Sequence, residues 1–306
     1  RKHFSYDLIL ASSPPITLAF PAFLIKFITK KPLIFDIRDI WPDSAVAIKK
    51  LKKNSIIYNF FKLVEKFIYK KADRITCVAS PMKDYIAQLS KRDDIKIIYN
   101  GVSEHLLKSQ STRAQIINTK NFVFSYAGNI GHAQGLYFLV QAFSDFLSLQ
   151  NHENSILQII GNGPEKENII KLVSDLGISR NIVFLNEVTK IDLSDILINS
   201  NVLLIPIVPS DIFNRTIPSK VFDYLSFGIP IIATVQGEGK KIILQSQSNI
   251  VTSLIESRDL ANAFVKMRLN FDFYNEHAYV NKEIAQNFSR EKSTDEFYKI
   301  CEAVIK

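Results

Sequence analysis

The feature that most limits the fold of this chain is a repeated alternation of short apolar runs with longer helical patterns. Strands that are apolar throughout and alternate with helices are typical of parallel sheets covered on both faces. The sequence therefore predicts an α/β protein. We expect strands at residues 7–11, 33–37, 74–79, 95–98, 122–127, 156–160, 182–185, 202–205, 230–233 and 250–252. We expect helices at residues 54–71, 81–89, 136–149, 166–176 and 220–227, and only helices beyond residue 260 or so.

The alternation is interrupted between residues 100 and 120. This stretch opens with the turn pair Asn100-Gly101, is rich in polar residues and has no apolar period. We expect an N-terminal domain at residues 1–105, a linker at 106–120, a second domain at 121–270, and helices at 271–306 that pack back towards the first domain. Both domains are expected to be doubly wound and Rossmann-like and to face a cleft, since ligands bind at the carboxyl ends of parallel strands. The first domain is short and enters a core-type strand almost at once, so we expect it to be incomplete.

Positive charge is concentrated in the first third of the chain. Residues 1–110 contain 20 Lys+Arg and 10 Asp+Glu, whereas the whole chain has a net charge of +8. Such asymmetry indicates an anionic partner, which can be a membrane surface, a nucleic acid or a phosphorylated substrate. Nucleic acid is not expected, because there is no recognised motif and no platform of stacking side chains.

Cysteine usage and apolar run length indicate where the protein works. The two cysteines form no CxxC pair, which argues against a disulfide framework or a zinc site and fits the cytoplasm. No apolar run reaches the roughly 20 residues that span a bilayer. A peripheral position on the inner face of the plasma membrane is expected from Lys49, Lys50, Lys52 and Lys53, which precede the helical stretch 56–71. That stretch carries an apolar stripe that we expect to pack on its own sheet: Ile57, Phe60, Phe61, Val64, Phe67 and Ile68.

Three charges and the only tryptophan follow the strand expected at residues 33–37. The segment reads Phe-Asp-Ile-Arg-Asp-Ile-Trp-Pro over residues 35–42. Charges at the carboxyl end of a parallel strand are costly unless they are paired or used. Two interpretations stay open: Asp39 and Arg38 act on a ligand, or an Asp–Arg pair fixes the loop while Trp41 plugs the core.

Two further segments have the composition of an anion site. The turn at residues 128–135 contains three glycines between a strand and a helix, where free N–H groups favour a phosphate; the turn at residues 161–163 is of the same kind. A helix is expected to begin near Pro218, with Ser219 and Lys220 in its first turn and Asp223 one turn later. A lysine at a helix start can hold a diphosphate, and the acid can accept hydrogen bonds from ribose hydroxyls. The alternative is a capped amphipathic helix, stopped by Gly228, with solvated charges.

In this order and spacing, the segments resemble bacterial glycosyltransferases of family 4, which have the GT-B fold and make cell-surface polysaccharides such as O-antigen and capsule. Residues 36–43 resemble the family's D-x-R-D-L-W-P segment, and residues 69–81 its YrkADritvvSp segment. Residues 100–102 resemble its NGVD hinge, residues 126–135 its glycine-rich donor loop, and residues 218–230 its PSK-x-fEYla-G-kPvia segment. The resemblance covers nearly the whole chain.

The resemblance implies a retaining hexosyl- or N-acetylhexosaminyltransferase. It would move a sugar from a nucleoside diphosphate sugar, UDP-linked by resemblance, to a lipid-linked or glycan acceptor, with no cofactor and no obligatory metal. Asp39 and Arg38 would be catalytic, with Asp39 facing the transferred sugar and the acceptor. The implied donor-binding residues are Gly128, Asn129, Gly131, His132, Glu187, Arg215, Ser219, Lys220 and Asp223.

The chain departs from the family pattern at several points. Arg215 stands where the first glutamate of the family's E-x7-E motif is expected, and Asn129 and Gln134 replace an arginine and a lysine of the donor loop. The family also has strands before the equivalent of residue 7. These departures leave an alternative open, in which the chain is a donor-binding remnant or partner subunit without transfer activity.

Overall fold

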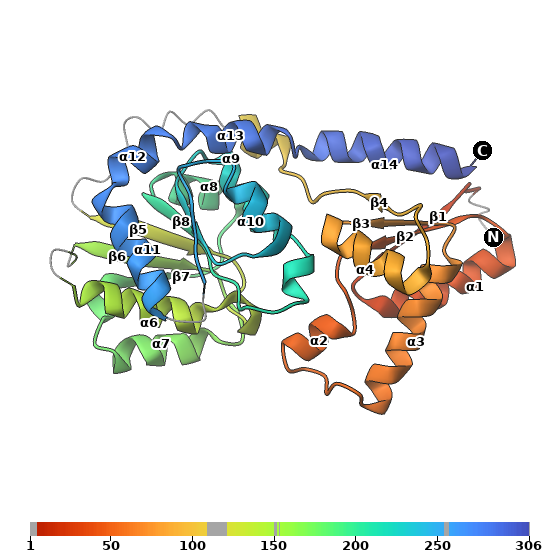
Figure 1. The fold of residues 1–306 in the computed structure, drawn as a ribbon, viewed down its shortest axis with the longest axis horizontal. Helices are drawn as coiled ribbons and strands as arrows, with labels where there is room; N and C mark the ends of the chain where they lie inside the picture. Colours follow the sequence, from red (N-terminus) through yellow and green to blue (C-terminus); the bar gives the residue numbers. More distant parts are fainter. Residues whose placement is uncertain (1–4, 109–120, 150–151, 153, 254–256, 306) are drawn as a thin grey trace. The chain divides into compact units, whose positions relative to one another are not determined.

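The computed structural model describes residues 5–108, 121–149, 152, 154–253 and 257–305, and these form two compact α/β units (Figure 1). The first unit comprises Arg1–Gly101, Ser210–Ile217 and Arg290–Lys306, and the second comprises Val102–Pro209 and Pro218–Ser289. Each unit contains one parallel sheet. The expected α/β class and Rossmann-like architecture are confirmed.

The first unit is built on a four-stranded parallel sheet in the order β1-β2-β3-β4. The strands are β1 (Ile9–Ser13), β2 (Leu33–Ile37), β3 (Arg74–Cys77) and β4 (Lys96–Ile97). β2 is buried because its apolar residues on both faces are covered. The helices of this unit are α1 (Ala19–Thr29), α2 (Asp43–Ala47), α3 (Ile56–Lys71), α4 (Ser80–Ser90) and α14 (Arg290–Ile305).

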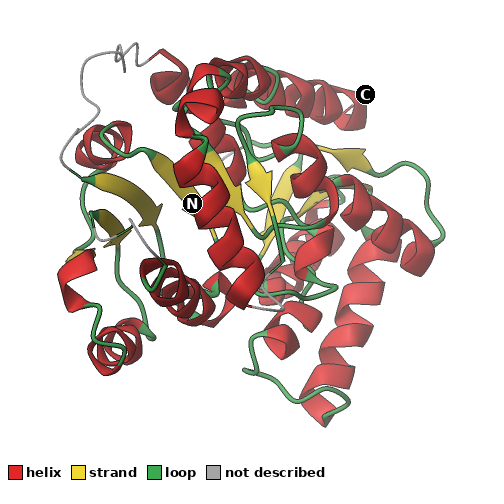
Figure 2. Ribbon diagram, turned by 60° about the vertical axis from the view of Figure 1, so that its left-hand side comes forward, coloured by secondary structure: helices red, strands yellow, loops and turns green. Residues whose placement is uncertain are grey.

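The second unit is built on a six-stranded parallel sheet in the order β10-β9-β8-β5-β6-β7. Its strands are β5 (Phe122–Ala127), β6 (Ser155–Ile160), β7 (Ile182–Leu185), β8 (Val202–Ile205), β9 (Ile231–Ala233) and β10 (Ile250–Val251). Helices flank these strands on both sides (Figure 2). The helices are α5 (Glu104–Lys108), α6 (Leu136–Leu147), α7 (Lys166–Asp175), α8 (Lys190–Ile198), α9 (Ser219–Ser226), α10 (Gly237–Ile243), α11 (Ser257–Leu269), α12 (Phe271–Glu276) and α13 (Tyr279–Gln286).

The units are discontinuous along the chain, unlike the contiguous domains expected from the sequence. Helix α14 belongs to the first unit, where Arg290 Nε donates to Gly101 O at 2.8 Å and Ser293 Oγ donates to Tyr99 O at 3.1 Å. The start of the expected linker, residues 106–108, lies in α5, and its remainder lies outside the described residues.

The apolar stripe of α3 is only partly covered. Ile68 is buried, but Ile57, Phe60 and Phe67 are 59%, 50% and 49% exposed. The expectation that this stripe packs on its own sheet is therefore wrong for these three residues. Lys49, Lys50, Lys52 and Lys53 are exposed, as predicted. In the part of the chain that the structure describes, none of the helices has the length and apolarity required to cross a membrane.

Candidate functional site

Two glycine turns of the second unit pack against each other through their backbones. The turn after β5 and the turn after β6 are joined by hydrogen bonds from Gly128 N to Ile160 O (2.9 Å) and from Ile130 N to Asn162 O (2.8 Å). Gly161 has a φ of +135°, and a Cβ there would lie 2.1 Å from Gly128 O. Only glycine fits this contact, so the two turns form one backbone platform at the carboxyl ends of β5 and β6.

Lys220 reaches this platform from the first turn of α9. Gly128 has a φ of +142°, and a Cβ on it would lie 2.3 Å from Lys220 Nζ. The ammonium group also lies 5.1 Å from the centre of the Tyr126 ring, within cation–π range. The sequence-predicted residues Gly128 and Lys220 are thus brought together.

The Lys220 ammonium has no hydrogen bond or ion pair with any residue that the structure describes. Burial lowers the pKa of Lys220, and the negative charge of Asp223 acts in the opposite direction. An ammonium removed from water without a hydrogen-bonding partner is costly. The site is therefore suited to an anion that would supply the missing hydrogen bonds.

Two tyrosines hold α9 and the glycine turn in place, and the sequence analysis did not identify either of them. Tyr224 of α9 is buried, and its Oη accepts a 2.8 Å hydrogen bond from Ala127 N at the end of β5. Tyr126 Oη donates to Asn129 O at 2.6 Å. Both tyrosines stand in segments that the sequence analysis singled out, but no local pattern shows which backbone group each hydroxyl contacts.

The other predicted donor-site residues of this unit are not all brought to Lys220. Asn129 is exposed, and its side chain lies beside Gly131, since a Cβ on Gly131 would be 2.8 Å from its Nδ2. His132 Nδ1 lies 3.3 Å from Glu165 Oε1. Ser219 is exposed at the start of α9, and Glu187 is exposed in the segment after β7. No described contact joins these last two residues to Lys220.

The acidic loop of the first unit contains an Asp–Arg pair, which joins Arg38 to Asp36. Arg38 Nε lies 3.4 Å from Asp36 Oδ2, and Arg38 Nη2 donates to Asn100 Oδ1 at 2.7 Å. Asp39 instead accepts a 2.7 Å hydrogen bond from Ser44 Oγ. The expected Asp–Arg pair is thus present, but Asp36 forms it, and Asp39 is not the partner of Arg38. Burial raises the pKa of Asp39, while the bond from Ser44 opposes that shift.

Trp41 and Arg215 are both held by aromatic contacts in the first unit. Trp41 is half-buried and packs edge-on against Phe61 at 4.5 Å, so the expectation that it plugs the core is wrong. Ile40 is fully buried in its place. The Arg215 guanidinium lies 4.7 Å from the centre of the Tyr85 ring.

Tyr85 belongs to a polar network that sequence reasoning missed. Its hydroxyl contacts Asp43 Oδ2 and Glu65 Oε1, each at 3.1 Å, and Lys62 Nζ donates to Asp43 Oδ2 at 2.9 Å. Glu65 is 1% exposed and is bonded to Lys62 and Tyr69. Burial raises the pKa of Glu65, with Lys62 acting in the opposite direction. These residues lie on three helices, and spacing along one helix could not reveal the cluster.

Two family models match adjoining parts of the chain. Residues 1–106 match the model described as Glycosyltransferase Family 4, and residues 121–270 match the model described as Glycosyl transferases group 1. The chain is 23% identical over 271 residues to the uncharacterized glycosyltransferase MJ1069 of Methanocaldococcus jannaschii, covering 85% of this chain and 66% of that protein. It is 24% identical over 171 residues to the probable glycosyltransferase WbjE of Pseudomonas aeruginosa, covering 54% of this chain and 42% of that protein.

The fold is shared with solved glycosyltransferase structures. The Anabaena protein HepE, solved in complex with UDP and glucose, superposes with a TM-score of 0.77 and 17% identity over 97% of this chain and 78% of that chain. The alignments span less than two thirds of each of the two curated relatives. Together the matches support a glycosyltransferase of the GT-B fold.

Proposed function

We propose that this chain is a retaining glycosyltransferase that moves a hexosyl or N-acetylhexosaminyl group from a UDP-linked donor to a lipid-linked or glycan acceptor. The observation that carries the proposal is the half-buried ammonium of Lys220, which lies against Gly128 without a hydrogen-bonding partner in the described residues. A diphosphate would complete this site. The two glycosyltransferase family models and the UDP complex of the structural neighbour agree with that ligand.

The leaving diphosphate is the group that the platform would stabilise. As the bond between sugar C1 and the β-phosphate oxygen breaks, negative charge accumulates on the diphosphate. Lys220 would hold that charge in a site that is partly shielded from water, where fixed charges act strongly. The acceptor oxygen forms the new bond to C1, and its proton passes to the departing phosphate, so that no separate strong base is required.

The remaining parts of the donor would extend along the neighbouring elements of the second unit. Asp223, which follows Lys220 by one helical turn, would accept hydrogen bonds from the ribose hydroxyls. The segment after β7 that contains Glu187 would contact the base. Asn129, Gly131 and His132 would line the diphosphate, with Ser219 at the helix start.

On the acceptor side, Asp39 would contact the transferred sugar and the acceptor hydroxyl. Its carboxylate accepts only one side-chain hydrogen bond among the described residues, from Ser44, which leaves acceptor capacity for a hydroxyl. Arg38 would act next to it, and Arg215 would supply positive charge that the donor loop lacks. The absence of an obligatory metal stays a prediction.

The first unit would hold the protein at the inner face of the membrane, in surface polysaccharide synthesis. Lys49, Lys50, Lys52 and Lys53 are exposed in one short segment before α3. An anionic leaflet attracts each nearby lysine by about 1 kcal/mol. Such binding would bring a lipid-linked acceptor and the enzyme to the same surface.

A calorimetric titration with UDP-, GDP- and ADP-sugars tests the proposed donor. We expect one UDP-sugar to bind more tightly than the others, and its affinity to fall when Lys220 is replaced. Absence of binding by every nucleotide sugar, or affinity that does not depend on Lys220, would show that the platform is not a donor site.

A further inference from the structure

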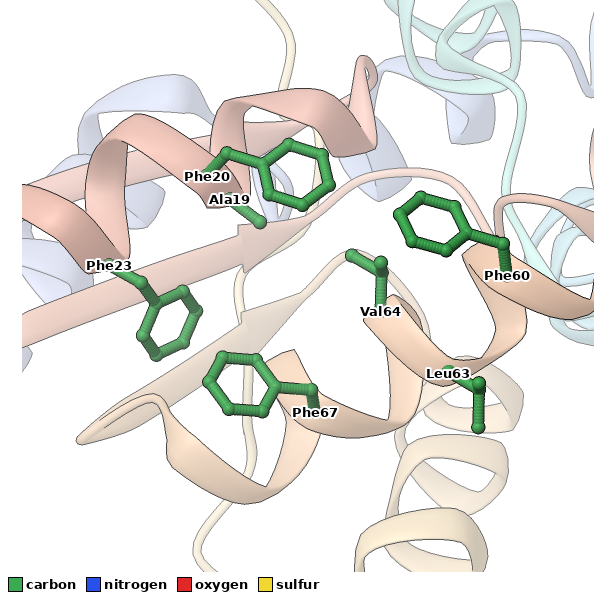
Figure 3. A pocket seen from close by; sticks show the side chains of 7 residues that line it. All are labelled: Ala19, Phe20, Phe23, Phe60, Leu63, Val64 and Phe67. Atoms are coloured by element: carbon green, nitrogen blue, oxygen red, sulfur yellow. The ribbon is translucent and has the colours of Figure 1, made fainter. Parts of the chain in front are cut away.

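An apolar groove runs between α1 and α3 on the first unit (Figure 3). Its volume is about 430 Å³. Every residue that lines it is apolar: Ala19, Phe20, Phe23, Phe60, Leu63, Val64 and Phe67. The donor and acceptor sites proposed above use none of these residues.

The groove is built by phenylalanines that project from the two helices towards each other (Figure 3). Phe20 stacks with Phe60 at 6.3 Å between ring centres, and Phe23 meets Phe67 edge-on at 4.8 Å. Phe20, Phe60 and Phe67 nevertheless remain about half exposed, and Leu63 is 69% exposed. These side chains are ordered by contact with one another, but a large part of their apolar surface faces water, which is unfavourable.

The exposed apolar surface extends beyond the groove along both helices. On α1, Leu24, Phe27 and Ile28 are 60%, 72% and 68% exposed, and on α3 Ile56 is 89% exposed. A surface that is apolar along two neighbouring helices matches the interfacial region of a lipid layer.

The charges around the groove select the kind of lipid. Between residues 48 and 71 the only carboxylate is Glu65, which is 1% exposed and bonded to Lys62. The exposed charges of that stretch are therefore all lysines: Lys49, Lys50, Lys52, Lys53, Lys66, Lys70 and Lys71. A second copy of this chain would bring like charges together, whereas an anionic lipid headgroup would be attracted.

We propose that the groove between α1 and α3 takes up hydrocarbon from an anionic lipid layer while the neighbouring lysines contact the lipid phosphates. This deepens the membrane association proposed above by adding an apolar contact to the electrostatic one. The lysines bring the protein to the surface, and the phenylalanines fix its depth and orientation there. The two contributions differ in salt dependence, because salt screens charges and leaves apolar burial in place.

The test compares two double variants of equal charge and similar exposure. One changes the groove, Phe60→Gln with Leu63→Gln, at residues that are 50% and 69% exposed. The control changes the second unit, Phe273→Gln with Leu269→Gln, at residues that are 46% and 72% exposed. Both variants should melt close to the wild type, because the altered side chains are largely exposed in each.

Co-sedimentation with phosphatidylglycerol vesicles should separate the two variants. We expect the groove variant to bind at least about tenfold more weakly than the wild type, which corresponds to a loss of roughly 1.4 kcal/mol of apolar burial. The control variant should bind as the wild type does. The difference between the two variants should persist at high salt, although both bind less there because salt screens the lysine attraction. The wild type should bind phosphatidylcholine vesicles more weakly than phosphatidylglycerol vesicles, because the lysine attraction is then absent. Equal binding by both variants would overturn the groove proposal and leave salt-dependent lysine binding intact.

Trp41 provides a second readout that reports contact with hydrocarbon. It is the only tryptophan, and it lies 4.5 Å from Phe61, whose ring is 5.2 Å from that of Phe60. Vesicles brominated in the acyl chains should quench its fluorescence in the wild type and in the control, but less in the groove variant. If the groove variant instead changes the sedimentation coefficient of the protein without lipid, the groove is a protein interface and the lipid proposal is wrong. Donor titration of the same samples tests the proposed function separately.

Discussion

Replacing Lys220 with methionine should weaken donor binding without destabilising the fold. Methionine keeps the length and the apolar part of the side chain but removes the ammonium that lies against Gly128. A hydrogen bond to a charged group contributes roughly 1.5–3 kcal/mol, so donor affinity should fall by about tenfold to a hundredfold. Burial lowers the pKa of Lys220, which means that the fold disfavours its charge. In the absence of donor, the Lys220→Met variant should therefore melt at the same temperature as the wild type or above it.

The assay is a calorimetric titration combined with thermal melting of the same preparation. Lys171→Met serves as the control, because Lys171 is exposed on α7 of the same unit and should affect neither quantity. A Lys220→Met variant that binds donor normally, or that melts several degrees lower, would refute the argument. In the second case Lys220 would be a stabilising residue of the fold rather than a cation kept for a ligand.

Three further outcomes follow from the same structure. Gly161→Ala should lower the melting temperature far more than Gly177→Ala, because a Cβ on Gly161 would lie 2.1 Å from Gly128 O whereas one on Gly177, also at positive φ, meets nothing within 4 Å. Asp39→Asn should reduce turnover with little change in melting temperature or donor affinity, since the amide oxygen can still accept the bond from Ser44; a variant with normal turnover would remove Asp39 from the reaction. Donor affinity should decrease as pH rises through the lowered pKa of Lys220. Binding in that pH range should take up a proton, because a bound diphosphate raises this pKa. Titrations in buffers of different ionisation enthalpy would show the uptake, and the Lys220→Met variant should lack it.

The fold could be predicted because most of its strands are mainly apolar. The sequence placed β2, β5, β7 and β8 at their observed bounds, since a parallel strand covered by helices leaves a mainly apolar run. The faces of α3 could not be predicted in the same way. Its periodicity identified an apolar stripe, but periodicity cannot say whether a sheet covers that stripe, and the structure leaves Phe60 and Phe67 half exposed.

The site could be predicted from the sequence where a turn required glycine. It could not be predicted where side chains from different elements meet. Gly128 and Lys220 were identified from local sequence and are in contact in the structure. The contact of Tyr224 with Ala127 joins residues 97 positions apart, and no local pattern reveals it. The sequence indicated an Asp–Arg pair after β2 but not which acid forms it: Asp36 lies beside Arg38, whereas Asp39 accepts a hydrogen bond from Ser44.

Transfer of labelled sugar to lipid tests the central claim most directly. The protein would be incubated with the UDP-sugar that binds best and with anionic vesicles carrying lipid-linked acceptors, and label in the lipid extract would be counted. We predict transfer by the wild type, with release of one UDP for each sugar moved, and strongly reduced transfer by Lys220→Met and Asp39→Asn. Tight donor binding without transfer to any lipid or glycan acceptor would contradict the account and favour a donor-binding protein without transferase activity.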